Sequence, residues 1–202
     1  MHHARLDINI LDLWLFGSGR GEGAHIDSTP LLDAKGLPYV PGRAVKGLLR
    51  DAARELLLLQ SPGEQQASER LTALFGTREE HGQTRHNTQP GRLQFTDARL
   101  PAALANALCA NRQTIKGLFH DIRATAIDDS TGTASAHTLR SIRAVVPMQL
   151  QAELSSSAAE DFVLIRQAAH LVTALGAHRS RGMGRCACSL HTTTPTSSHA
   201  LT

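Results

Sequence analysis

Alternating apolar and polar side chains mark two strands that lie far apart in the chain. Residues 6–10 (LDINI) and 144–154 (AVVPMQLQAEL) contain segments with an apolar side chain at every second position, which is the period of a half-buried strand. After residue 10 the apolar positions shift to Leu11, Leu13 and Leu15, and this change of phase predicts a bulge or a bend.

Helical periods separate these strands. Residues 43–60 repeat apolar side chains every three or four positions, which predicts an amphipathic helix. A second helix is predicted from Ser157, because Ser157 and Glu160 have the spacing of a capping box. Its apolar positions run to Leu175, and Gly176 follows where a C-terminal cap is expected.

Weaker patterns complete the predicted order of elements. Short helices are expected through residues 71–75 and 101–110, and further strands at 92–100 and 185–190. The order is then strand, helix, strand, followed by strand, helix, strand. This is an α+β pattern and predicts a ferredoxin-like (RRM-like) βαββαβ sheet with long inserted loops.

The chain is expected to form a single domain over residues 1–190. Small, polar and turn-forming residues fill positions 123–141, where a projecting hairpin or loop is predicted. Thr and Ser dominate residues 191–202, which are expected to be a disordered tail.

Composition narrows the function only slightly. The formal net charge is +3 and the pI about 9.1, so local clusters of basic residues must decide whether nucleic acid is a partner. No apolar run is long enough to span a membrane and no signal peptide is recognised, which predicts a cytoplasmic protein. The three cysteines have neither a disulfide nor a zinc spacing.

One basic cluster lies on the first predicted helix. Arg43, Lys46, Arg50 and Arg54 are spaced by three, four and four residues and form one stripe, with Gly47 inside it. The N–H groups at a helix start attract phosphate, and a glycine lets another backbone approach. A solvated helix face is the alternative interpretation, and the spacing of a phosphate-binding Walker loop is absent.

A second basic cluster follows the last predicted helix. Four basic side chains interleave with glycines in GAHRSRGMGR, residues 176–185. Exposed backbone N–H groups with guanidinium forks suit a phosphodiester chain, although an ordinary exposed hairpin has the same composition. Aromatic residues make up only 3% of the chain, which favours contact with the backbone of a nucleic acid over base stacking.

Several segments resemble a known family. LPYVPGRAVKGLLR (37–50) resembles the Pro-Gly and Lys-Gly motif of the RAMP superfamily of CRISPR-associated proteins. GAHRSRGMGR resembles its C-terminal glycine-rich loop, and LFG (74–76) followed by GRLQFTDA (91–98) resembles its central segment. IDDSTGTA (127–134) and the IDS sequence of residues 26–28 resemble the backbone (Csm-like) subunit of type III effector complexes.

The resemblance covers about residues 6–190 and implies a role. Such subunits polymerise along a CRISPR guide RNA, together with other effector-complex subunits, and a thumb, here residues 123–146, wedges into the guide–target duplex. Complementary target RNA is cut at regular intervals with a divalent metal ion, Mg²⁺ or Mn²⁺. The RNA-binding residues implied or suggested here are Gly42, Arg43, Lys46, Gly47, Arg50, Arg140, Arg143, His178, Arg179, Arg181, Gly182 and Arg185.

The same resemblance makes Asp27 the catalytic aspartate and the ligand of the metal ion. A carboxylate can hold a hard cation, but one aspartate is a poor site, so weak metal binding without RNA is expected. His25 is a candidate general base. Composition alone favours a simpler interpretation, in which Asp27 and His25 are an ordinary loop carboxylate and a solvated loop histidine.

Three alternatives to a cutting subunit stay open. A RAMP protein can hold guide RNA as a scaffold without cleaving. A stand-alone guide-processing ribonuclease usually carries two ferredoxin-like units, whereas this chain has one Pro-Gly motif and one glycine-rich loop. A nucleotide-binding domain is the last alternative, and the missing Walker and G-x-G-x-x-G motifs argue against it.

Overall fold

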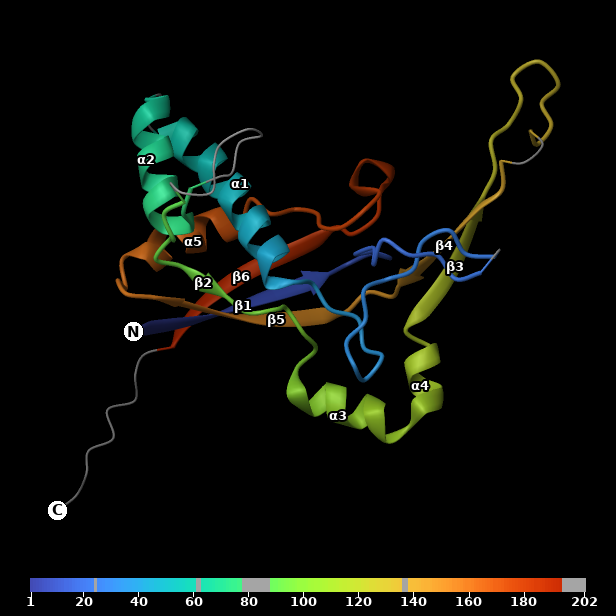
Figure 1. Ribbon diagram of the computed structural model, residues 1–202, viewed down its shortest axis with the longest axis horizontal. Helices are drawn as coiled ribbons and strands as arrows, with labels where there is room; N and C mark the ends of the chain where they lie inside the picture. Colours follow the sequence, from blue (N-terminus) through green and yellow to red (C-terminus); the bar gives the residue numbers. More distant parts are fainter. Residues whose placement is uncertain (24, 61–62, 78–87, 136–137, 194–202) are drawn as a thin grey trace.

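A four-stranded antiparallel sheet organises the protein in the computed structural model, which describes residues 1–23, 25–60, 63–77, 88–135 and 138–193. Leu6, in the middle of the sheet, pairs with Ala152 on one side and with Leu190 on the other. The strands are β1 (His2–Ile10), β2 (Gln94–Phe95), β5 (Gln149–Ser156) and β6 (Cys186–Thr193), in the spatial order β2-β5-β1-β6 (Figure 1).

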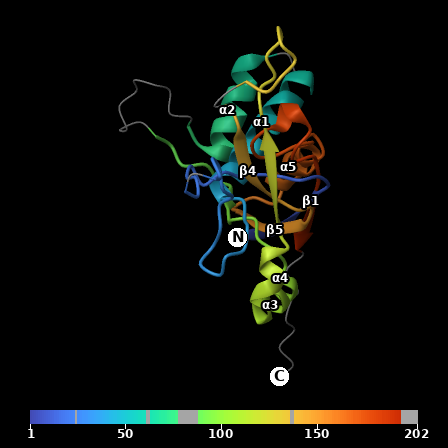
Figure 2. The same ribbon diagram turned by 90° about the vertical axis from the view of Figure 1, so that its right-hand side faces the viewer.

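Helices lie on both sides of this sheet. On one side, α1 (Gly42–Gln60) packs against α2 (Glu64–Phe75) and α5 (Asp161–Ala169). On the other side lie α3 (Ala102–Ala110) and α4 (Arg112–Lys116), as Figures 1 and 2 both show. The apolar positions of α1 are buried in the main core, which confirms the helical period predicted for residues 43–60. The fold is therefore α+β with antiparallel sheets.

A separate two-stranded sheet extends away from the core. It pairs β3 (Phe119–Ala124) with β4 (Arg140–Val145), from Phe119 opposite Val145 to Ala124 opposite Arg140. Figure 1 shows the hairpin projecting well beyond the four-stranded sheet. The sequence predicted a projecting hairpin or loop here, but it missed β3, which starts four residues before the expected boundary at Arg123.

The predicted strand over residues 144–154 is two strands instead. β4 ends at Val145 and β5 begins at Gln149, with Pro147 exposed between them. Proline has no N–H group to donate to a strand ladder. The chain therefore leaves the hairpin at this proline and enters the main sheet.

The second long helix is shorter at both ends than the sequence predicted. Glu160 rather than Ser157 is its N-cap, and Ser156 donates its hydroxyl to the Asp161 carboxylate at 2.5 Å, so the capping box is not formed. At the other end the backbone pairs with the glycine-rich loop, because Leu175 N–H donates to the Gly184 carbonyl at 2.9 Å. α5 ends at Ala169, well before Gly176.

Residues 191–193, assigned by the sequence to a disordered tail, are the last residues of β6. They stay in the sheet because His191 and Thr192 lie opposite Arg5 and Ala4 of β1. Residues 194–202 of the predicted tail lie outside the described residues. Among the helices that the structure describes, none is long and apolar enough to cross a membrane.

The two ends of the glycine-rich loop pack closely against each other. Gly184 has φ +71°, and a Cβ atom there would lie 2.1 Å from the Leu175 carbonyl oxygen. Gly182 has a similar φ of +79°, but a Cβ atom there would meet nothing within 4 Å. The two glycines therefore share a left-handed conformation that would strain any residue with a Cβ atom, and they differ in available space.

We expect Gly184→Ala to lower the free energy of unfolding by about 3 kcal/mol or more, because it adds a clash with backbone to the positive φ. Gly182→Ala is the matched control and should cost only about 1–2 kcal/mol, the strain of the left-handed conformation. Urea denaturation of both variants measures the difference. Equal losses would contradict the close packing at Gly184.

Candidate nucleic-acid interface

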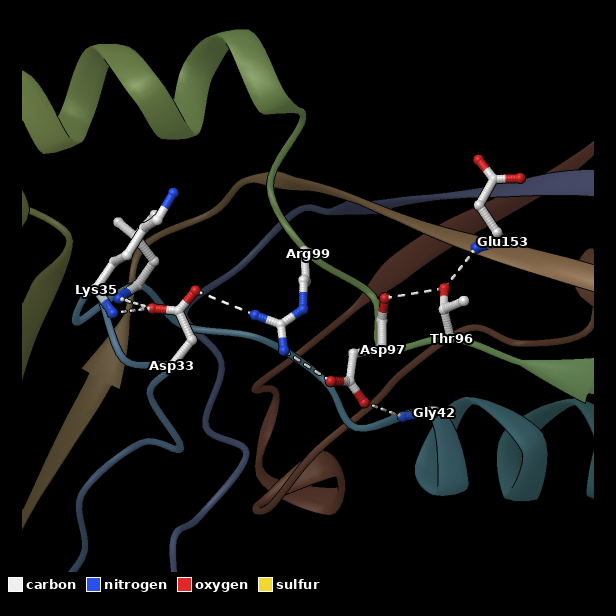
Figure 3. Close-up of polar contacts among 8 residues, drawn as sticks. Asp33, Lys35, Gly42, Thr96, Asp97, Arg99 and Glu153 are labelled. Carbon is white, nitrogen blue, oxygen red and sulfur yellow. Dashed lines mark hydrogen bonds and ion pairs between the residues drawn. The ribbon is translucent and has the colours of Figure 1, made fainter.

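An ion-pair network fixes the start of α1. Arg99 lies between two carboxylates, donating to Asp97 at 2.8 Å and to Asp33 at 3.1 Å (Figure 3). The other oxygen of Asp97 accepts the Gly42 N–H at 2.9 Å. This hydrogen bond from Gly42, followed by Arg99, lowers the pKa of Asp97. The network ties the loop before α1 to the end of β2.

The start of α1 is less open to phosphate than the sequence suggested. Gly42 N–H is taken by Asp97, and the Ala44 and Val45 N–H groups both donate to the Pro41 carbonyl. A Cβ atom on Gly42 would lie 2.7 Å from the Phe95 carbonyl oxygen. Close packing on β2 therefore explains Gly42 without RNA.

The basic stripe of α1 divides into two kinds of side chain. Arg50 donates to the Gly76 carbonyl at 3.0 Å and so connects α1 to the end of α2. Arg43 is exposed and Lys46 half-buried, and neither makes a hydrogen bond or ion pair with another described residue. Their charges stay available to a partner molecule.

Packing within the described part of the protein does not require a glycine at position 47. A Cβ atom there would meet nothing within 4 Å, although a glycine inside a helix costs about 0.5–1 kcal/mol relative to alanine. By helical spacing Gly47 lies between the basic stripe and Ala44, Leu48 and Asp51. Open space beside this glycine matches the predicted close approach of another backbone.

A pocket of about 270 Å³ joins the two basic segments. One wall is formed by α1 and the other by the glycine-rich loop. Its lining residues are Phe16, Gly17, Ala44, Leu48, Asp51, Gly176, Ala177 and Arg179. The structure thus brings together two segments that lie more than 120 residues apart in the sequence.

The glycine-rich loop presents two arginines in a 3₁₀ turn over Arg179–Arg181. His178 before it has φ 60°, and its carbonyl accepts the Arg181 N–H at 2.8 Å. Arg179 and Arg181 are exposed and make no ion pair with a described residue. Arg185 differs, because it forms a two-pronged ion pair with Asp12, which lowers the pKa of Asp12.

Asp27 is exposed and is held at the outer end of β4, next to the tip of the hairpin. Its backbone N–H donates to the Ser141 carbonyl at 2.7 Å, and its Oδ2 accepts the Ser141 N–H at 2.7 Å. Next to it, the Ser28 carbonyl accepts the Arg143 N–H at 2.9 Å. The loop that carries Asp27 is therefore docked along β4, with the second carboxylate oxygen left for another ligand.

The other charged groups at this place are already paired or solvated. Arg143 donates to both oxygens of Asp121 and also pairs with Glu22. Asp121 is the main cause that raises the pKa of Arg143. Arg140 is exposed at the start of β4, and His25 is exposed in the turn before Asp27. Arg143, predicted as an RNA contact, has its charge met by two carboxylates.

The structure tests how a divalent metal ion would fit. Among the described residues, no group of three or more His, Cys, Asp or Glu side chains is placed to hold a metal ion. Asp27 offers one carboxylate oxygen beyond the one bonded to Ser141. Mg²⁺ commonly binds through one or two carboxylates, with waters and substrate phosphates completing its shell. The chain thus fits the ion only as a partial ligand that RNA completes.

A larger hollow of about 600 Å³ lies between the Asp27 loop and the hairpin. Arg20 and Glu22 line it from the loop, and Phe119 and Arg143 from the hairpin. Sequence analysis gave Asp121, Ser141 and Phe16 no role, because their partners are distant in the chain. No local pattern marks such residues.

The family is decided by a match over most of the chain. Residues 7–187 match the family model described as RAMP superfamily. The chain belongs to the RAMP superfamily. This confirms the resemblance to the RAMP superfamily seen in the sequence. No curated protein matches the chain.

Solved structures show the same fold. The first example is a chain of the cryo-EM structure of the Type III-B Cmr-beta bound to cognate target RNA, with a TM-score of 0.65 and 12% identity, covering 93% of this chain and 96% of that one. The second is a chain of Type III-B Cmr-beta in the apo state, with a TM-score of 0.64 and 13% identity, covering 96% and 98%. This RAMP protein thus shares its fold over nearly its whole length with chains of those complexes.

We expect Asp97→Ala to lower the free energy of unfolding by about 1 kcal/mol at neutral pH, the usual cost of losing a side chain that caps a helix start. The folded pKa of Asp97 is lowered, so its stabilisation is present above the unfolded pKa of about 3.9 and is lost as pH falls through the folded pKa. Urea denaturation between pH 7 and pH 3 measures this.

Asp97→Asn is the matched control for this prediction. It keeps an acceptor for Gly42 and removes the charge beside Arg99, so its loss should be smaller. A difference between the native chain and Asp97→Ala that stayed constant down to pH 3 would contradict the assignment.

Proposed function

We propose that this RAMP protein is a guide-RNA-binding backbone subunit of a type III CRISPR effector complex, and that it cuts complementary target RNA through Asp27. The observation that carries the proposal is the position of Asp27, exposed on a loop docked along β4 of the projecting hairpin. Family membership and the fold shared with chains of Type III-B Cmr-beta structures support it.

In this proposal the four-stranded sheet is the ferredoxin-like palm and the β3–β4 hairpin is the thumb. The spatial order β6-β1-β5-β2 supports the palm, because the first and third strands of a βαββαβ unit then lie in the middle. Its two crossover helices, α1 and α5, pack against each other. The thumb is supported by the exposed tip of the hairpin, residues 125–135 and 138–139.

Guide RNA would lie along α1 and the glycine-rich loop. Four of the cations predicted there as RNA contacts make no ion pair with a described residue, whereas Arg50, Arg143 and Arg185 are engaged within the protein. An unpaired cation beside open surface attracts phosphate without reading sequence. The four are Arg43, Lys46, Arg179 and Arg181.

Cleavage would depend on how Asp27 is held. Ser141 fixes one carboxylate oxygen, so the other points to a defined place beside the hairpin, where target RNA would lie. Mg²⁺ or Mn²⁺, when bound there with RNA, would stabilise the charge that develops on the phosphate. His25, exposed in the same turn, is proposed as a general base, because histidine titrates near neutral pH.

A catalytically inactive scaffold is the second candidate. It is favoured by one observation, that the described residues contain no cluster of three metal-binding side chains. Either candidate assembles with further copies of itself and with other effector subunits. The contact between copies is expected to be heterologous, because a chain that follows RNA repeats by translation and rotation.

We expect Asp27→Ala to slow cleavage of a guide-complementary RNA by the assembled complex at least about 100-fold, a typical loss for a catalytic side chain. Asp27→Asn should do the same while keeping an acceptor for Ser141. The measurement is cleavage with Mg²⁺, together with target affinity. Native complex that binds target without cutting it would establish the scaffold instead.

We expect Lys46→Glu and Arg179→Glu each to weaken guide binding regardless of guide sequence. They should also reduce the slope of log affinity against log salt by about 0.7 for each lost phosphate contact. Filter binding at several salt concentrations measures both. Arg166→Glu, an exposed position on α5, is the matched charge reversal and should leave binding unchanged. Equal effects of all three variants would place the guide elsewhere.

A further inference from the structure

Arg143 holds two separate pieces of the chain at once. Its guanidinium donates through Nε and Nη2 to the two carboxylate oxygens of Asp121, at 2.8 and 3.1 Å, across the β3–β4 hairpin. Its remaining Nη1 pairs with the carboxylate of Glu22, in the loop before Asp27. A planar fork that meets two acidic partners fixes direction as well as distance.

Glu22 is linked to Asp27 through a tight turn. The Glu22 N–H donates to the Ile26 carbonyl at 2.8 Å, and the two residues form a bridge. Gly21 permits this turn, because a Cβ atom there would lie 2.6 Å from the Ile26 carbonyl oxygen. A displacement of Glu22 would therefore also displace the backbone of Ile26, the residue before Asp27.

The other side of the loop is joined to the same strand. Asp27 bonds Ser141 through both its backbone and its carboxylate, and Ser28 accepts the Arg143 N–H. Ser141 and Arg143 are both in β4. The Asp27 loop is thus held along one edge by backbone hydrogen bonds and across its turn by an ion pair.

We propose that Arg143 is a positioning residue, which locks the Asp27 loop to the hairpin through Glu22 and Asp121 and so sets the direction of the Asp27 carboxylate. This rests on the proposed function for its effect on cleavage. It replaces the role expected for Arg143 from the sequence, because a guanidinium already held by two carboxylates attracts phosphate weakly.

The ion pairs of Arg143 also connect the hairpin to the Asp27 loop. Asp121 is on β3, Arg143 on β4 and Glu22 on the loop, so a shift of the hairpin against target RNA moves the loop with it. Displacement of a catalytic group by about 1 Å can cost about 100-fold in rate. Loss of the ion pair between Arg143 and Glu22, with the backbone bonds to Ser141 kept, should lower the cleavage rate by less than this.

The test compares the native complex with four single variants and with the double variant Arg143→Met/Glu22→Gln, all assembled on the same guide. Arg143→Met removes the fork, Glu22→Gln removes the loop partner and Arg143→Lys keeps the charge without the fork. Arg5→Met is the matched control, since Arg5 pairs with Asp7 at 3.1 Å on the main sheet. Single-turnover cleavage rate, target affinity and hydrogen exchange of peptides containing Asp27 and Ser28 are measured for each.

The proposal expects Arg143→Met and Glu22→Gln each to slow cleavage about 10-fold with unchanged target affinity. Exchange at Asp27 and Ser28 should become faster, and Arg143→Lys should recover part of both. The double variant should be no slower than Arg143→Met alone, because both changes break one connection. Arg5→Met should match the native chain in all three measurements.

Weaker target binding with an unchanged rate would overturn the proposal and return Arg143 to an RNA contact. A native rate and native exchange in Arg143→Met would also overturn it. If Asp27→Ala cuts as fast as the native chain, the proposed function fails instead. In that case the exchange measurement alone decides whether Arg143 holds the loop.

Discussion

Backbone hydrogen bonds between Trp14 and Val145 join the two sheets of this protein. Each residue donates its N–H to the other's carbonyl, at 3.0 and 2.7 Å, and the Trp14 indole donates to the Val146 carbonyl at 3.1 Å. Both side chains are fully buried in the core. The end of β4 is thereby fixed to the segment after β1, and the Asp27 loop docks a few residues earlier on the same strand. This junction fixes where the hairpin leaves the core, and the bonds of Asp27 to Ser141 and of Ser28 to Arg143 then place the Asp27 loop on β4.

A second constraint is the set of ion pairs that carboxylates form with some of the arginines. Arg185 forms an ion pair with Asp12, Arg143 with Asp121 and Glu22, and Arg99 with Asp97 and Asp33. These pairs are partly exposed, so each contributes little to the free energy of unfolding. Their main effect is geometric, because they hold loops in place. Arg43, Lys46, Arg179 and Arg181, on α1 and the glycine-rich loop, have no acidic partner among the described residues.

Local sequence patterns gave much of the fold. The helical period of residues 43–60 predicted α1, the alternation of residues 6–10 predicted β1, and the order of elements indicated an α+β protein. The patterns failed where distant contacts decide the backbone. Pro147 divides a predicted strand, and Leu175, predicted to be helical, instead pairs with Gly184 beyond the end of α5. β3 carries no strong alternation, since its stability comes from pairing with β4 across a long excursion of the chain.

The sequence by itself determined the family, the positions of its motifs and the presence of two basic, glycine-containing segments. These features depend on residue type and near neighbours, which a linear chain displays directly. Only the tertiary structure decided which arginines are neutralised, that Gly47 faces open space, and that Ser141 and Arg143 hold the loop of Asp27. Those properties depend on groups brought together from far apart in the chain, and their partners are chosen by packing and charge after folding.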